Sequence, residues 1–328
     1  MTCFPPMPRP IRAAVNPAAI SANIKRIKEL LGPVKLMPVV KANGYGHGLE
    51  RIIDGLKQAD ALAILEIDGA ARLRNLGWNK PIVLLEGCFD QADLAKAEKL
   101  GCDWVVHNQN QLDDLEVVAR HMPTHKPRIF LKLNTGMNRL GFQPVDAKSA
   151  IQWLDEFTLK HDWPTPVLMT HFANADEAEP RSRLPFVQHQ HQTLLGLKPA
   201  HWQSSLANSA GSLNFPMLAC DIARPGIAIY GATPGPNAAA NYGLKPAMTF
   251  SSEIISIQNV RKGDRVVTVL GGRLVTVAES LWWLRLCRWL PPSCAGWNSH
   301  LRRRTCGTGR RPSIDGHDDH RCQSHSEC

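Results

Sequence analysis

Eight short apolar runs recur along the chain at regular intervals, and they constrain its fold more than any other feature. Each run has the length and the apolar content of a buried strand. The runs are residues 36–41, 61–65, 82–86, 103–107, 128–133, 167–171, 201–206 and 226–230. Between them lie amphipathic stretches, such as 90–100 and 108–121, that are long enough for crossover helices. This alternation predicts parallel βα units.

The number of strands favours one of two parallel architectures. An open sheet usually has fewer than eight strands, whereas a (β/α)8 barrel has eight. We therefore expect an α/β fold with a TIM-like (β/α)8 barrel over residues 15–235, after a leader and an opening strand over 1–14. The first helix is expected to begin at Asn16 and Pro17 and to stop at Gly32.

After residue 235 the pattern changes. Residues 236–247 resemble a loop, and residues 248–266 alternate like an edge strand followed by a turn, so we expect a β-rich domain to begin within 236–266. The remainder, 267–328, contains four of the nine tryptophans, five of the nine cysteines and no lysine. This composition matches no fold that we can assign.

Two explanations of residues 267–328 are open. The first is an out-of-frame translation, because a one-base shift turns the single tryptophan codon into a glycine codon. In one such frame residues 285–291 can encode Gly-Tyr-Ala-Asp-Gly-Tyr, and residues 313–318 can encode Val-Ser-Met-Asp-Met. The second is a metal site, since metal-ligating residue types lie close together at His317, His320, Cys322, His325 and Cys328.

Charge and hydropathy argue against two classes of partner. The net charge is +9, but lysines and arginines within 1–266 are interleaved with acidic residues as on a solvated surface, so no nucleic-acid partner is expected. The proline-rich start lacks the apolar core of a signal peptide, and no later run reaches transmembrane length. Scattered cysteines at 3, 88, 102 and 220 suit a reduced cytoplasmic protein without a membrane partner.

Polar side chains fall at the ends of several expected strands, where (β/α)8 barrels gather their chemistry. They are Lys41, Glu86, His107, Lys132, His171 and Asn208. Lys41, in VVKANGYGHG, could form a Schiff base with an aldehyde, because desolvation favours the neutral amine. An ion-paired lysine at the barrel mouth explains the same segment equally well.

Four further motifs offer polar groups at or near strand ends. In KLNTGMNRLGF, Arg139 follows Lys132 by seven residues, and its planar guanidinium suits a carboxylate, although a surface cation is an alternative. His171, in THFANADE, could stack, transfer a proton or simply be hydrogen-bonded. The segments ANSAG and ARPGIAIYG combine a hydroxyl, backbone N–H groups and an arginine at late strand ends, where barrels commonly bind phosphate.

These five motifs, in this order and at these separations, resemble those of bacterial alanine racemases over roughly residues 11–266. The family consists of pyridoxal 5'-phosphate (PLP) enzymes with a barrel and a β-domain. The resemblance implies interconversion of L-alanine and D-alanine, which supplies D-alanine for peptidoglycan. It also implies PLP as cofactor and a homodimer.

The resemblance implies a role for each matching residue. Lys41 would hold PLP and act as base on one face of the substrate α-carbon. Arg224 would face the pyridine nitrogen, and His171 would contact the ring or its support. Arg139 would bind the substrate carboxylate, and Lys132, often carbamylated in the family, would orient it. The other cofactor-binding residues would be Tyr45, Ser209, Gly226 and Ile227 at the phosphate, with Asn208 beside them.

The second base of the family is a tyrosine from the β-domain of the partner subunit, soon after the equivalent of KGDRV. Here Val267, Thr268 and Val269 follow that segment, and no tyrosine occurs after Tyr242. We therefore expect impaired racemisation and a weakened or absent dimer. Two other functions are open: a PLP-binding barrel without racemase activity, and an amino-acid racemase of broader specificity.

Overall fold

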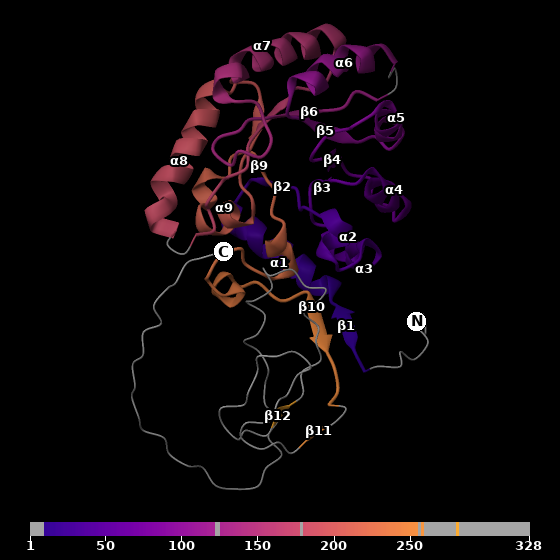
Figure 1. Ribbon diagram of the computed structural model, residues 1–328, viewed down its shortest axis with the longest axis vertical. Coiled ribbons are helices and arrows are strands. Elements are labelled where there is room, and N and C mark those ends of the chain that lie inside the picture. Colours follow the sequence, from indigo (N-terminus) through magenta and orange to yellow (C-terminus); the bar gives the residue numbers. More distant parts are fainter. Residues whose placement is uncertain (1–9, 122–124, 178–179, 255–256, 259–279, 282–328) are drawn as a thin grey trace, which may run out of the picture. The chain divides into compact units, whose positions relative to one another are not determined.

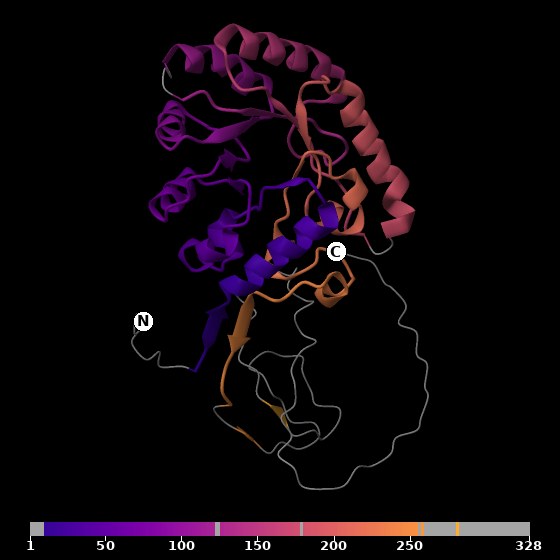
Figure 2. The same ribbon diagram turned by 180° about the vertical axis from the view of Figure 1, so that it is seen from behind.

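The chain divides into two units, residues 1–253 and residues 254–328. The computed structural model (Figures 1 and 2) describes residues 10–121, 125–177, 180–254, 257–258 and 280–281. The expected out-of-frame tail lies outside the described residues, apart from strand β12 (Ser280–Leu281). The five residues of the alternative metal site also lie outside them.

A ring of parallel strands forms the first unit. Six strands pair in the order β3-β4-β5-β6-β7-β8, and β2 pairs with β9. The Val40 amide donates to the Ala63 carbonyl (2.8 Å), and the Arg224 amide donates to the Ala207 carbonyl (2.8 Å), which closes the ring on both sides of the β2-β9 pair. The strands are β2 Lys35–Leu36, β3 Leu62–Ile64, β4 Ile82–Leu84, β5 Asp103–Val106, β6 Ile129–Lys132, β7 Val167–Met169, β8 Gln203–Ser205 and β9 Ile222–Ala223.

Helices join successive strands and lie around the outside of the ring (Figure 1). None in the described part of the chain has the length and apolar character needed to cross a membrane. The helices are α1 Pro17–Leu31, α2 Lys41–Tyr45, α3 Leu49–Ile52, α4 Ile67–Asn75, α5 Gln91–Lys99, α6 Gln109–His121, α7 Pro144–His161, α8 Pro180–Leu197 and α9 Ser209–Asn214. Short 3-10 helices are η1 Ile53–Leu56, η2 Pro216–Leu218, η3 Ile227–Tyr230 and η4 Ala239–Tyr242.

The expected first helix is confirmed as α1. The Asn16 side chain accepts from the amides of Ala18 and Ala19, which satisfies two backbone donors at the helix start. At the other end Gly32 adopts a φ of 68°, a conformation that suits glycine and stops the helix. Strands β3 to β8 also lie inside the expected runs, so the barrel prediction is confirmed.

The expected strand at 226–230 is wrong. Residues Ile227–Tyr230 form the 3-10 helix η3, and the last strand of the ring is β9, which lies a few residues earlier. A short apolar run has no periodicity that separates a buried strand from a buried helix. Pro225 and Gly226, which follow β9, mark the real turn.

The expected strand at 36–41 is shorter than predicted. Strand β2 ends at Leu36, and Val39 makes only an isolated bridge to Ala63. Lys41 is the first residue of α2 rather than the last residue of a strand. Beyond β2 the backbone still donates to the neighbouring segment, from Met37 to Ala223 (2.8 Å) and from Val39 to Pro225 (2.9 Å), before the chain enters the left-handed turn after Lys41.

Apolar side chains fill the inside of the ring. Alternate positions of nearly every strand contribute to one buried cluster. Its members are Met37, Val39, Ala63, Val83, Val105, Phe130, Val167, Met169 and Ile222. The ring is therefore a packed core, and ligands must approach from its ends.

An antiparallel pair extends the first unit. Strand β1 (Arg12–Val15) pairs with β10 (Met248–Ser251), in a register that places Arg12 opposite Ser251. Helix α1 also contacts this late segment, because the Asn23 side chain donates to the carbonyls of Ile229 (3.0 Å) and Lys245 (2.8 Å). In the second unit, β11 (Ile257–Gln258) pairs antiparallel with β12.

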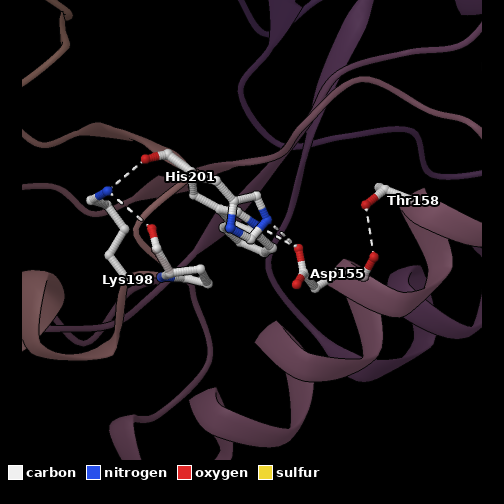
Figure 3. Close-up of polar contacts among 6 residues, drawn as sticks. Asp155, Thr158, Lys198 and His201 are labelled. Carbon is white, nitrogen blue, oxygen red and sulfur yellow. Dashed lines mark hydrogen bonds and ion pairs between the residues drawn. The ribbon is translucent and has the colours of Figure 1, made fainter.

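A polar cluster joins α7 to the loop that precedes β8. Figure 3 shows Asp155 between Thr158 on its own helix and His201 of that loop. Asp155 Oδ1 accepts from His201 Nε2 and from the indole Nε1 of Trp202, both at 2.8 Å. Because the loop leads into the N-terminal end of β8, this histidine–carboxylate pair lies at the end of the barrel opposite to the strand ends that bear the candidate residues.

Substituting Asp155 with alanine is expected to destabilise the fold by about 1–3 kcal/mol, because the indole N–H of the buried Trp202 loses its acceptor. Urea unfolding measures this change. Asp155→Asn, which keeps an acceptor oxygen, should lose less. Equal losses for the two variants would contradict the role of that hydrogen bond.

Candidate active site

The polar residues expected at strand ends lie at the C-terminal end of the barrel. Lys132 is the last residue of β6, and Lys41 lies five residues after β2. The others follow their strands closely: Glu86 after β4, His107 after β5, His171 after β7, Asn208 after β8 and Arg224 after β9. Residues from seven strands therefore face one end of the ring.

The segment directly after Lys41 is a left-handed turn. Ala42, Asn43 and Tyr45 have φ values of 51°, 53° and 50°, and Gly44 between them has 65°. Each non-glycine residue in this conformation costs about 1 kcal/mol or more. Such a turn persists only where neighbouring groups hold it, so its surroundings reveal what positions Lys41 and Tyr45.

Groups of α3, of α4 and of the residue before α4 hold this turn. Glu66, the residue before α4, accepts from the Ala42 amide (3.2 Å). Asn43 Oδ1 accepts from the Leu49 amide (3.1 Å) and from Arg72 of α4 (2.9 Å). Arg72 also donates to both carboxylate oxygens of Glu50. None of these contacts was expected from the sequence, although Asn43 lies within the quoted motif.

A small cradle lies where Tyr45 meets the segment after β9. A side chain at Gly226 would overlap the Tyr45 hydroxyl and lie 3.1 Å from its ring carbon Cζ. Ser209 Oγ accepts from the amides of Gly226 (2.8 Å) and Ala228 (3.3 Å). The cradle thus combines two hydroxyls and backbone N–H groups, which is the donor chemistry that binds phosphate. Ile227 follows Gly226 as the first residue of η3.

Asn208 stabilises the loop that presents Ser209. Its Oδ1 accepts from the Gly211 amide (2.9 Å) and caps α9, and its Nδ2 donates to the Phe172 carbonyl (3.1 Å). The side chain therefore ties the loop after β8 to the loop after β7. The structure gives Asn208 a supporting position next to the cradle.

Arg224 is a buried cation, with 3% of its surface exposed. Its guanidinium donates to the Ser205 hydroxyl and to the carbonyls of Thr170 and Leu206, none of which is charged. Burial lowers the pKa of Arg224 to about 9. This value is above neutral pH, so the side chain stays protonated and supplies positive charge to the end of the barrel.

Lys132 and His171 lie in the same positive field. Burial, with the charges of Arg224, Arg139 and Lys41, lowers the pKa of Lys132 to about 8, although Glu86 opposes this shift. Burial and the same cations, together with Lys132, lower the pKa of His171 to about 3. His171 is therefore neutral at physiological pH. The pKa of His107 is lowered by burial and by Lys132, which places His107 at the edge of this group.

Arg139 lies in a loop with a defined shape. Asn134 Oδ1 accepts from the amides of Gly136 (3.1 Å) and Asn138 (3.0 Å), and the Phe142 amide donates back to the Lys132 carbonyl (2.9 Å). Arg139 is exposed, yet it lines one shallow pocket with Lys132 and His171. The loop therefore presents, beside two groups of the barrel mouth, a guanidinium that makes no hydrogen bond or ion pair with the residues that the structure describes.

A buried glutamine supports the same end of the barrel and was missed in the sequence. Gln190 of α8 is fully buried and makes hydrogen bonds to the amide (3.0 Å) and the carbonyl (3.1 Å) of Ala173. It also accepts from the Thr135 hydroxyl (3.4 Å), which lies 2.8 Å from that of Thr170. A lone glutamine within an amphipathic helix gives no signal of this role.

The pKa of His171 predicts a dependence of stability on pH. An unfolded histidine titrates near 6.5, so the unfolded state binds more protons than the folded state as pH falls from about 6.5 towards 3. Between pH 7 and pH 5 this histidine should reduce the free energy of unfolding by about 1–2 kcal/mol. His171→Gln should remove that part of the slope in urea unfolding of the cofactor-free protein. An unchanged slope would contradict a His171 that is neutral in the folded protein.

Comparison with known proteins identifies the family. The model of the alanine racemase N-terminal domain matches residues 15–234, which is most of the barrel. The chain belongs to the alanine racemase family. An alanine racemase of Janthinobacterium sp. (strain Marseille) is 42% identical over 261 residues, covering 79% of this chain and 70% of that protein. The alanine racemase of Verminephrobacter eiseniae (strain EF01-2) is 36% identical over 321 residues, covering 94% of this chain and 79% of that protein.

Solved alanine racemase structures share the fold. The enzyme from Acinetobacter baumannii superposes with a TM-score of 0.73 at 31% identity, covering 81% of this chain and 73% of that one. The enzyme from Bartonella henselae, which contains covalently bound pyridoxal phosphate, gives a TM-score of 0.68 at 23% identity, covering 82% and 73%.

Proposed function

We propose that this protein interconverts L-alanine and D-alanine with PLP bound at the C-terminal end of the barrel, in the cytoplasm, and thereby supplies D-alanine for peptidoglycan. The observation that most supports this proposal is the left-handed turn, which places an amine and a phenol from one short segment beside the segment after β9. Lys41 Nζ lies 6.0 Å from the centre of the Tyr45 ring, and the Tyr45 hydroxyl reaches Gly226.

The residues present fit PLP at three points. The cradle of Tyr45, Ser209 and Gly226 offers two hydroxyl donors, the Gly226 amide orients the Ser209 hydroxyl, and the absence of a side chain at Gly226 keeps the cradle open. Arg224 offers a buried donor that stays protonated and would face the ring nitrogen. Lys41 offers the amine that an aldehyde requires. When bound, PLP supplies an electron-withdrawing ring that stabilises negative charge on the substrate α-carbon.

Within this proposal the side chains bind, orient and move protons. Because a guanidinium donates hydrogen bonds but cannot accept them, Arg224 would keep the ring nitrogen unprotonated. His171 would contact the ring in its neutral form. Arg139 would bind the substrate carboxylate, and a carbamylated Lys132 would orient it. The lowered pKa of Lys132 supports carbamylation, since only the neutral amine reacts with CO2.

Racemisation needs a base on each face of the α-carbon. Lys41 is proposed to move the α-proton of D-alanine. The chain has no tyrosine after Tyr242, so we propose that the base for L-alanine is missing and that net racemisation is impaired. We also propose that the homodimer usual in the family is weakened here.

The match to the Verminephrobacter protein extends into the segment where the missing tyrosine would lie. It covers 94% of this chain, whereas residues 1–266 are only 266 of 328 residues, or about 81%. The alignment therefore includes part of the segment that composition assigns to an out-of-frame tail. Translating the gene from codon 264 onwards in all three frames decides whether a β-domain with its tyrosine is encoded.

The experiment that tests the function uses the full chain with added PLP. Reduction with borohydride followed by peptide mass spectrometry should find the cofactor on Lys41. In D2O, NMR should show the α-proton of D-alanine exchanging faster than the amino acid racemises. Cofactor attachment without exchange from either isomer would overturn the proposal in favour of a PLP-binding barrel. Equal rates with other amino acids would indicate broader specificity, and racemisation as fast as exchange would contradict the missing base.

A further inference from the structure

His47 is a buried histidine that none of the roles above uses. It lies two residues after Tyr45, and only 5% of its surface is exposed. Its Nδ1 lies 3.1 Å from the carbonyl oxygen of Gly44 and 3.1 Å from that of Tyr45. Carbonyl oxygens accept hydrogen bonds and do not donate them, so Nδ1 must bear the proton.

The other ring nitrogen of His47 has no such partner. Among the described residues nothing lies within hydrogen-bond distance of its Nε2, which is buried. Burial also lowers the pKa of His47. A second proton, on Nε2, would have no acceptor in this environment, so the ring is neutral and holds its single proton on Nδ1. Such an unpaired buried nitrogen destabilises the fold, and it persists only where the rest of the side chain compensates.

What the His47 ring holds is the left-handed turn itself. Both of its acceptors are backbone carbonyls of that turn, at residues with positive φ. On the inner side the ring packs against Tyr230, with ring centres 4.5 Å apart.

Tyr230 in turn connects the segments on either side of Lys41. Its hydroxyl donates to the carbonyl of Val39 (3.2 Å), and its ring centre lies 5.1 Å from that of Tyr45. His47 and Tyr230 therefore contact the backbone both before and after Lys41. Movement of the backbone that carries Lys41 and Tyr45 would have to break one of these contacts.

We propose that His47 is a positioning residue for the cofactor site: in its neutral Nδ1–H form it fixes the left-handed turn and so places the Tyr45 hydroxyl at the phosphate cradle. This inference rests on the proposed binding of PLP. It assigns no proton transfer to His47. The essential feature is one N–H donor at the δ position of the side chain.

Two amide substitutions separate the two ring positions. The Asn side chain places an N–H near the position of Nδ1, whereas the longer Gln side chain places one near Nε2. His47→Asn should keep PLP affinity within about threefold of the unchanged protein. His47→Gln should weaken PLP at least about tenfold, measured by absorbance titration of the cofactor-free protein. Pyridoxal, which lacks the phosphate, should show a smaller loss in the Gln variant.

A histidine at the other end of the barrel gives a matched control. His125 also contacts a backbone carbonyl, that of Cys102, but through Nε2 (2.8 Å). His125→Asn and His125→Gln should leave the affinity for PLP unchanged, whatever they do to stability. A second readout is made on the unchanged protein. ¹⁵N NMR should show His47 as the Nδ1–H tautomer, and its signal is assigned as the one that is absent in His47→Asn.

The outcomes separate this inference from the proposed function. If the unchanged protein does not bind PLP, the proposed function fails. If it binds PLP and both His47 variants bind PLP as tightly as the unchanged protein does, the inference is overturned. An Nε2–H tautomer, or an equal loss of PLP and pyridoxal affinity in His47→Gln, also overturns it.

Discussion

Replacement of Lys41 with alanine is expected to abolish covalent attachment of PLP and to lower α-proton exchange from D-alanine by about 10³-fold or more. The substitution removes both the amine that attaches the cofactor and the proposed base for one face of the substrate. Intact mass after borohydride reduction measures the attachment, and NMR in D2O measures the exchange. Both readouts are needed because Lys41 has two proposed roles: the mass reports attachment of the cofactor, and the exchange reports removal of the α-proton.

The matched control for Lys41 is Lys57, an exposed lysine whose side chain pairs only with Asp54 among the described residues (2.8 Å). Lys57→Ala should leave attachment and exchange unchanged. The stability of the Lys41 variant should also be nearly unchanged, since Lys41 lies at the partly exposed barrel mouth and makes no hydrogen bond within the described part of the chain. Borohydride labelling of the Lys41 variant at the same level as the unchanged protein would contradict the proposed site.

The second large effect is expected at Gly226. A methyl group there would occupy the position of the Tyr45 hydroxyl, so the phenol must move away from the phosphate cradle. We expect Gly226→Ala to weaken PLP about 100-fold, which corresponds to about 2.7 kcal/mol. Equilibrium titration with PLP and with pyridoxal measures the loss, and pyridoxal should lose much less because it lacks the phosphate.

A double substitution tests the physical reason for that loss. Tyr45→Phe removes the hydroxyl that the new methyl group would meet. If the Tyr45 hydroxyl is the group displaced, Gly226→Ala combined with Tyr45→Phe should bind PLP no more weakly than Gly226→Ala alone. Gly196 of α8 is the control glycine, because a side chain there meets nothing within 4 Å. Gly196→Ala should keep PLP affinity and gain up to about 1 kcal/mol of stability. Additive losses in the double variant would contradict the steric explanation.

Local chemistry made much of the fold predictable. Asn16, Pro17 and Gly32 define the ends of α1 through capping and backbone preference, and each acts within a few residues. The strands β3 to β8 were predictable because apolar runs with polar ends recur at a regular spacing. The run at 226–230 failed because five apolar or small residues suit a buried 3-10 helix as well as a buried strand.

The position of the candidate site residues at one end of the barrel was predictable, but their contacts were not. Lys41, Arg139 and Arg224 stand out because they lie in motifs that resemble those of alanine racemases, since their charge and position alone also suit an ion pair or a surface cation. Tyr45 contacts Gly226, and His47 contacts Tyr230. In both cases the two residues are separated along the chain by more than half the length of the first unit. Gln190 could not be found at all, since its function depends on which carbonyl and amide the folded loop after β7 presents to α8.

The closure of the barrel also has a consequence for how the chain folds during synthesis. Two early strands pair with late ones. Strand β2 pairs with β9, where Lys35 lies opposite Ile222, and β1 pairs with β10. The Asn23 side chain of α1 makes a hydrogen bond to the Lys245 carbonyl, 222 positions away. Synthesis proceeds at about 5–20 residues per second, so roughly 10–45 s pass between the emergence of the first and of the second partner of these contacts from the ribosome.

During that interval the apolar side of α1, including Ile20, Ile24 and Ile27, is without its late partners. Contacts of such long sequence separation form slowly even in a finished chain. The nascent protein is therefore most exposed to aggregation just before the segment around β10 emerges, because the barrel and α1 still lack their late partners.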